Sequence, residues 1–131
     1  MKKVYQTKGL TQQDGHDGDC FAACVASILE TSINKEAQGN AWKDKDKWFE
    51  NIQKIYKKDG VKLTRINSPE QQKALTGYYI GVLNLKNGSG PGHAVVMFAN
   101  VGVVHNPLDN VNKNFPYDQY KLVTIVVVEK Q

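Results

Sequence analysis

The sequence lacks several features on which major classes of protein depend. Its 131 residues include two cysteines, Cys20 and Cys24, which are too few for a disulfide scaffold. No stretch approaches the roughly 18 consecutive apolar residues of a membrane span, and no apolar run of about 7–15 residues follows the first lysines, as it does in a secretory signal. We therefore expect two free thiols, a reducing cytoplasm, and no membrane partner.

Arginine is almost absent as well. Only Arg65 of the 17 basic residues is an arginine, and the net charge is a modest +4. Proteins that read nucleic acids usually present arginine forks and a clustered basic face. Here the lysines alternate with acids over residues 43–47, which is typical of a solvated helix face. We expect no nucleic-acid partner.

The first half of the chain shows helical patterns. Apolar residues fill nearly every position from Cys20 to Leu29, which predicts a helix covered on most sides. Asp17 or Asp19 is suited to cap its N-terminus. Apolar residues recur at helical spacing over residues 44–58, which predicts a second, amphipathic helix.

The remainder of the chain favours strands. Alternating apolar residues predict a strand at 61–66, and the β-like segments after Gly77 predict strands at 78–85, 93–99, 101–105 and 122–128. A short entry strand is expected at 4–7. Helices followed by antiparallel strands indicate an α+β fold, with a sheet of about four to six strands. The length favours a single domain over residues 1–131.

Cys20 stands where a catalytic thiol is expected. It opens the apolar helix directly after the polar, glycine-rich segment that ends in DGD. The thiolate is the nucleophilic form, and the positive partial charge and unpaired amides of a helix N-terminus favour it. The same amides can bind a developing oxyanion. Cys24, one turn later among apolar residues, is interpreted as part of the core.

A histidine and an asparagine complete the pattern. His93 begins one predicted strand, and Asn106 follows the next strand, directly before Pro107. In a hairpin of these two strands, their outer ends lie side by side. The Asn106 amide oxygen is then able to accept a hydrogen bond from the His93 ring and hold its tautomer, as an orienting residue does in a catalytic triad.

The motifs DGDCFAACVASIL and GHAVVMFANVGVVHNP, in this order, resemble the papain-like cysteine peptidase superfamily. The most similar branch is that of the compact bacteriocin-leader (double-glycine) peptidases, together with small phage and bacterial proteins that begin with a VYQT-like strand. The resemblance covers residues 4–29 and 77–108. It implies a papain-like fold whose nucleophile helix packs on an antiparallel sheet, with Cys20 as nucleophile, His93 as base and Asn106 as orienter.

The resemblance also implies a glutamine upstream of the cysteine as an oxyanion-hole donor, commonly six residues before it. Asp14 occupies that position here. Gln6, on the predicted entry strand, is the preferred counterpart, and Gln13 is the alternative. Phe21 replaces a glycine that often follows the cysteine in the leader peptidases.

The implied activity is that of a thiol hydrolase, a cysteine peptidase that acts on a peptide or protein amide bond without a cofactor. Deamidation and transglutamination use the same machinery and stay open. If a phage encodes the chain, its place is the cytoplasm of the bacterial host. The alternative is an inactive papain-like module that binds and inhibits a host protein, which the departures at residues 14 and 21 favour.

Three further assignments compete with this site. His105 faces the other way on its strand and acts as the base only if the register slips. Asp109 is an alternative orienter. A zinc site would combine His16, Cys20, Cys24 and His93, but Cys24 lies in an apolar run and no CxxC pair is present, so we expect no metal.

Overall fold

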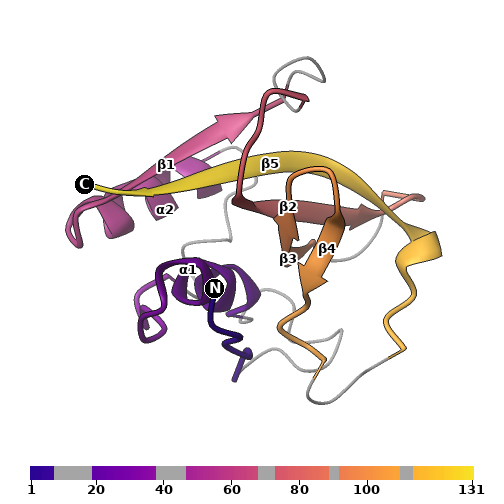
Figure 1. Ribbon diagram of the computed structural model, residues 1–131, viewed down its shortest axis with the longest axis horizontal. Helices are drawn as coiled ribbons and strands as arrows, with labels where there is room; N and C mark the ends of the chain where they lie inside the picture. The colour runs from indigo at the N-terminus through magenta and orange to yellow at the C-terminus, as the bar shows by residue number, and fades with distance from the viewer. Residues whose placement is uncertain (8–18, 38–46, 68–72, 89–91, 110–113) are drawn as a thin grey trace.

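The computed structural model describes residues 1–7, 19–37, 47–67, 73–88, 92–109 and 114–131. These residues form two α-helices, a five-stranded antiparallel sheet and a short 3₁₀ helix, so the predicted α+β class is confirmed (Figure 1). The elements are α1 (Cys20–Leu29), α2 (Trp48–Lys57), β1 (Val61–Ile66), β2 (Tyr78–Leu85), β3 (His93–Phe98), β4 (Gly102–His105), η3 (Tyr117–Gln119) and β5 (Tyr120–Lys130).

The strands are ordered β1-β5-β2-β3-β4, and every neighbouring pair is antiparallel. Consecutive strands β2, β3 and β4 form a meander, while β5 inserts between β1 and β2. Asn100, with φ of 65°, and Gly102, with φ of 109°, supply the left-handed backbone of the tight turn from β3 to β4. This turn brings the start of β3 beside the end of β4, as the sequence predicted.

Helix α1 is buried on all sides through most of its length. Phe21 and Val25 fill the core, and the small residues Ala22, Ala23 and Ala26 are at most 1% exposed. Such small side chains let the helix backbone approach the sheet, where α1 packs mainly on β3 and β2. The predicted buried helix is confirmed, and its N-terminal residue Cys20 is carried to the start of β3.

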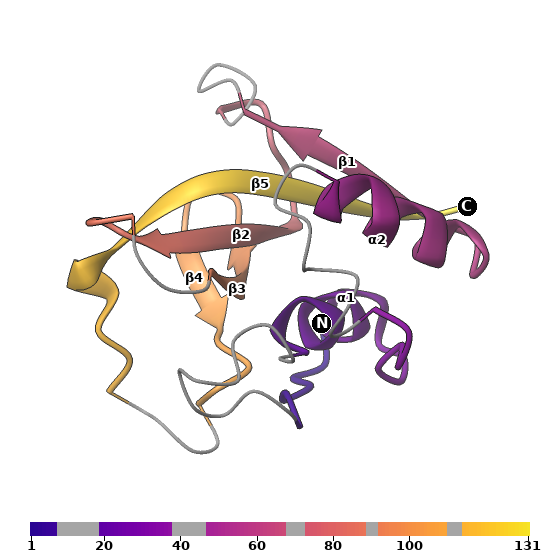
Figure 2. The ribbon, with the colours of Figure 1, turned by 180° about the vertical axis from the view of Figure 1, so that it is seen from behind.

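Helix α2 buries one face, formed by Phe49, Ile52 and Tyr56, and packs against β1. In Figure 2, α2 runs alongside β1 at one end of the sheet. The guanidinium of Arg65 lies 5.5 Å from the centre of the Trp48 ring, which is cation–π distance. The predicted helix began at residue 44, but residues 44–46 lie outside the described ranges.

Both helices cover the same face of the sheet. Cross-strand neighbours such as Val126, Ile80 and Val96 point to one side, and they belong to one cluster with residues of α1 and α2. The fully buried members make up most of this core: Phe21, Ala22, Cys24, Val25, Ala37, Ile52, Ile80, Ala94, Val96 and Val126. Burial of this face packs the two helices against the strands in one core.

The predicted entry strand at residues 4–7 is wrong. These residues are not in a β-ladder. The backbone amides of Val4 and Thr7 donate to side chains, and that of Gln6 donates to the single carbonyl of Pro107. The Val4 amide donates to Ser27 Oγ of α1, and the Val4 carbonyl accepts from His105 Nε2 of β4 at 2.7 Å. The segment lies between α1 and the end of β4 rather than extending the sheet.

The predicted capping by Asp19 is also wrong, and Asp17 lies outside the described residues. Asp19 occupies the N-cap position of α1, but its side chain caps no helix amide. It is fully buried, and its carboxylate accepts hydrogen bonds from the amide and hydroxyl of Thr7 at 2.9 and 2.7 Å. Asp19 therefore fastens the N-terminal segment to the start of α1.

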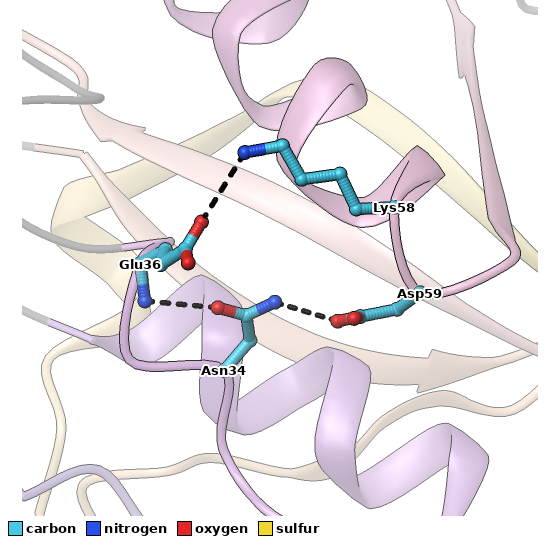
Figure 3. A network of polar contacts seen from close by, with 4 residues as sticks. All are labelled: Asn34, Glu36, Lys58 and Asp59. Atoms are coloured by element: carbon cyan, nitrogen blue, oxygen red, sulfur yellow. Dashed lines mark hydrogen bonds and ion pairs between the residues drawn. The ribbon is translucent and has the colours of Figure 1, made fainter.

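A polar network joins the segment after α1 to the end of α2 (Figure 3). The amide of Asn34 donates to Asp59 at 2.7 Å, and Asn34 Oδ1 accepts from the Glu36 backbone amide at 2.9 Å. Lys58 and Glu36 form an ion pair at 3.7 Å, but both side chains are mostly exposed, so this pair contributes little. The network sets the position of α2 relative to α1.

None of the helices in the described ranges is long and apolar enough to cross a membrane.

We expect the same substitution to act differently at two valines. Val126 is fully buried at the centre of the core, whereas Val101 is 70% exposed in the β3–β4 turn. Val126→Ala should lower the free energy of unfolding by about 2 kcal/mol, and Val101→Ala by less than about 0.5 kcal/mol, as measured by urea denaturation. Equal losses in the two variants would contradict the assignment of the core.

Candidate active site

Cys20 is brought to the first two residues of β3. Cys20 is half-buried, and its sulfur lies within hydrogen-bonding reach of the Ala94 backbone, directly after His93. The backbone amides of Cys20 and Phe21, at the first turn of α1, also face the sulfur. These amides are the unpaired donors of a helix N-terminus. No hydrogen bond between Cys20 and His93 is present among the described residues.

His93 and Asn106 meet as the sequence predicted. The distance between His93 Nε2 and Asn106 Oδ1 is 2.7 Å, and both residues are buried. They come from adjacent antiparallel strands, His93 as the first residue of β3 and Asn106 as the residue that follows β4. The hairpin therefore places the His93 and Asn106 side chains next to each other.

A turn after β4 fixes the orientation of the Asn106 amide. The backbone amide of Leu108 donates to Asn106 Oδ1 at 3.0 Å, and the amide of Asp109 donates to the Asn106 carbonyl at 2.9 Å. Asparagine at the first position and proline at the second are typical of such a turn. Because a backbone N–H can only donate, the side-chain atom of Asn106 that Leu108 contacts must be the oxygen.

This orientation determines the tautomer of His93. Since the amide oxygen of Asn106 can only accept, His93 Nε2 must carry the proton in the 2.7 Å hydrogen bond. In the neutral ring, Nδ1 then holds the lone pair and is the atom able to take a proton. The arrangement is that of a base whose second nitrogen is held by an orienting group.

Two aromatic residues that the sequence analysis missed complete the surroundings of this pair. Asn106 Nδ2 donates to the hydroxyl of Tyr117 at 3.1 Å, and the Phe115 ring packs on His93 with 4.9 Å between ring centres. Both lie in the segment FPY, residues 115–117, just before β5. The only signal in the sequence is this pair of aromatic residues around a proline, which is too general to indicate a site.

Gln6 lies at the edge of the same region. Its backbone amide donates to the Pro107 carbonyl at 3.1 Å, and its side chain is buried, with 4% exposure. The preferred glutamine is therefore carried next to the turn that holds Asn106. Gln13, the alternative, lies outside the described residues.

Burial governs the ionisation of Cys20. It raises the pKa of the thiol above its ordinary value, and the charge of Asp19 acts in the same direction. Hydrogen bonds from the backbone of Ala94 and of the helix N-terminus lower the pKa, as expected for this position, but burial outweighs them. The helix terminus alone thus does not produce a thiolate.

Burial also keeps His93 neutral. It lowers the pKa of the imidazole, while the hydrogen bond to Asn106 and the charge of Asp109 raise it. The resting site therefore contains a thiol and a neutral base. Such a pair can react by transferring the proton when a substrate binds.

The contacts of His105 and Asp109 do not support their assignment as alternative base and alternative orienter. His105 is on the neighbouring position and bonds away from the site, to the Val4 carbonyl. Asp109 closes the turn through its backbone amide, so Asn106 is the residue that holds His93. Cys24 is fully buried in the core cluster, as predicted.

For zinc, no group of three or more potential ligands occurs among the described residues, and His16 lies outside them.

Comparison of the chain with protein-family models, with curated proteins and with solved structures finds no match. The functional argument therefore depends on the geometry of the site.

We expect the pKa of His93 to follow the residue at position 106. An acceptor at Nε2 favours the protonated ring, so Asn106→Ala should lower the His93 pKa further, and Asn106→Asp, with its negative charge, should raise it above that of the wild type. A nitrogen-15 NMR titration of the histidines measures both shifts. His105, held by Val4, should move far less and is the internal control. Equal shifts at both histidines would contradict the assigned contact.

Stability should fall in mild acid. Burial lowers the pKa of His93 and of His105, so the unfolded chain takes up protons more readily than the folded one. The free energy of unfolding should be greatest above about pH 6.5 and decrease as the pH falls below that value. Urea denaturation between neutral pH and about pH 5 measures the slope, which His93→Gln with His105→Gln should reduce. An unchanged slope in the double variant would assign the effect to other groups.

Proposed function

We propose that the chain is a papain-like thiol hydrolase that cleaves a peptide or protein amide bond. The observation that carries the proposal is the 2.7 Å hydrogen bond between His93 Nε2 and Asn106 Oδ1, with the oxygen identified by the Leu108 amide. This hydrogen bond leaves Nδ1 of His93 as the base. His93 directly precedes Ala94, whose backbone lies within hydrogen-bonding reach of the Cys20 sulfur. Nucleophile, base and orienter thus come from three neighbouring points of the fold.

The proposed reaction has two halves. In the first, His93 Nδ1 takes the Cys20 proton while the sulfur bonds to the substrate carbonyl carbon. The carbon–nitrogen bond then breaks, and the imidazolium gives its proton to the leaving amine, which leaves a thioester on Cys20. In the second, His93 takes a proton from water, and the hydroxide adds to the thioester carbon and displaces the sulfur. The imidazolium returns its proton to the Cys20 sulfur, and the carboxylic acid is released.

The developing oxyanion needs donors near the sulfur. The backbone amides of Cys20 and Phe21 already face Sγ. We assign the side-chain amide of Gln6 as a further donor, because its residue is buried beside Pro107, at the turn that holds Asn106. Preorganised donors of this kind make a large contribution to acyl transfer.

The same steps serve two related reactions. If the carbonyl belongs to a glutamine side chain, ammonia leaves and deamidation results. If an amine replaces water in the second half, the product is a new amide. We place peptide hydrolysis first, in the cytoplasm, or in the cytoplasm of a bacterial host if a phage encodes the chain.

A second function is favoured by the raised pKa of Cys20. A thiol that burial keeps protonated, with no hydrogen bond to His93 in the described structure, is a weak nucleophile at rest. The alternative is therefore a papain-like module that binds and inhibits a host protein without chemistry. In that case Cys20→Ala would retain the full biological effect of the wild type.

We expect Cys20, and not Cys24, to be required for turnover. The purified chain is incubated with a mixture of denatured proteins, and mass spectrometry detects cleaved bonds, deamidated glutamines and cross-linked amines. Cys20→Ala should abolish every product, and His93→Ala should reduce the rate by about 100-fold or more. Cys24→Ala is the matched control and should retain activity in the folded protein.

Two results would contradict the proposed enzymatic function. One is wild-type chain that gives no product of any of the three kinds. The other is product formation that persists in Cys20→Ala, which would assign the reaction to a contaminant.

A further inference from the structure

Strand β1 forms one end of the sheet and pairs only with β5 among the described strands. The amide of Gln131 donates to the Gly60 carbonyl at 2.7 Å, so these two residues form a hydrogen-bonded pair just before β1. Hydrogen-bonded and non-hydrogen-bonded pairs alternate along an antiparallel ladder. The backbone groups of Val61, Leu63 and Arg65 therefore point away from β5, toward the side of β1 on which no described strand pairs.

One contact verifies this direction. Gln53, on α2, donates its side-chain amide to the Leu63 carbonyl at 3.1 Å. The carbonyl is accessible to Gln53 only because it is directed away from β5. A side-chain amide here occupies the place that the backbone N–H of an additional strand would take.

A groove of about 470 Å³ runs between this edge and α2. Val61 and Leu63 line it from β1, and Gln53 lines it from α2. Its charged lining residues are Lys54, Lys57 and Lys62 against a single glutamate, Glu50. The groove therefore combines backbone hydrogen-bonding groups along one side with an excess of positive charge.

We propose that this groove binds an extended acidic segment of a protein partner, which adds to the edge of β1 as a sixth strand. The outward backbone groups of Val61 and Arg65 pair with the segment, and its amide replaces that of Gln53 at Leu63. Strand addition supplies affinity through the main chain, and the lysines select for carboxylates.

The groove is separate from the candidate active site. Two strands, β5 and β2, lie between β1 and β3, so β1 is three strand spacings, or about 14 Å, from the strand that carries His93. The proposal therefore does not depend on the chemistry of Cys20, and it applies equally to an enzyme and to an inactive binding module.

The test uses the full chain and a fluorescein-labelled peptide of about ten residues with alternating glutamate and valine, followed by fluorescence anisotropy at low salt. The first comparison is the same peptide with N-methyl groups on its central residues, which keeps the charge but blocks strand pairing on both edges. The second replaces each glutamate by lysine. We expect the acidic peptide to bind and the two comparison peptides to bind at least about tenfold more weakly.

Matched protein variants localise the binding. Lys54→Glu with Lys57→Glu reverses charge at the groove and should weaken binding by about tenfold or more. Lys86→Glu with Lys121→Glu makes the same change in net charge at exposed positions outside the groove and should leave binding unchanged. Circular dichroism checks that both variants are folded.

Three results would overturn the proposal. The first is no binding of the acidic peptide by the wild type, and the second is equal binding of the N-methylated peptide, which would exclude strand addition. The third is equal weakening in the two double variants, which would indicate a general charge effect rather than this groove.

Discussion

The candidate site depends on a single oxygen atom, Oδ1 of Asn106. This oxygen accepts one hydrogen bond from the backbone amide of Leu108 and another from the ring of His93. The backbone donor identifies the atom as oxygen, and the oxygen then identifies which nitrogen of His93 carries the proton. The turn after β4 thereby sets the chemistry of a residue on another strand.

The placement of Cys20 is a compromise between packing and reactivity. Helix α1 is buried along its length because its small residues fit closely against β3 and β2, and this fit carries Cys20 to the start of β3. The same packing leaves Cys20 half-buried, and this desolvation raises the pKa of the thiol. A catalytic role for Cys20 therefore needs a base that takes the proton during the reaction, and His93 is neutral and able to do so.

Much of this arrangement was predictable from local patterns. The continuous apolar run after Cys20 indicates a buried helix, and the valine-rich runs on both sides of Asn100 indicate the hairpin that joins His93 to Asn106. Both predictions depend only on residues that are close to one another in the sequence. The role of Asp19 was not predictable, because aspartate at a helix start usually caps the helix, and here its carboxylate is engaged by Thr7 from the N-terminal segment.

The contacts of Phe115 and Tyr117 were beyond sequence reasoning for a similar reason, since they arise from a segment outside the hairpin and carry no periodic signal. Residues 4–7 look like a strand because valine, tyrosine and threonine are common in strands, yet Ser27 and His105 satisfy part of their backbone. Local periodicity thus predicted the elements, and the side-chain contacts between distant segments required the structure.

The central claim is that His93 serves as the base for Cys20, and the rate of Cys20 alkylation by iodoacetamide as a function of pH tests it most directly. Mass spectrometry separates Cys20 from the buried Cys24. We predict that Cys20 reacts at neutral pH and that His93→Ala slows this reaction by about tenfold or more. A Cys20 alkylation rate at neutral pH that is the same in the wild type and in His93→Ala would contradict the account.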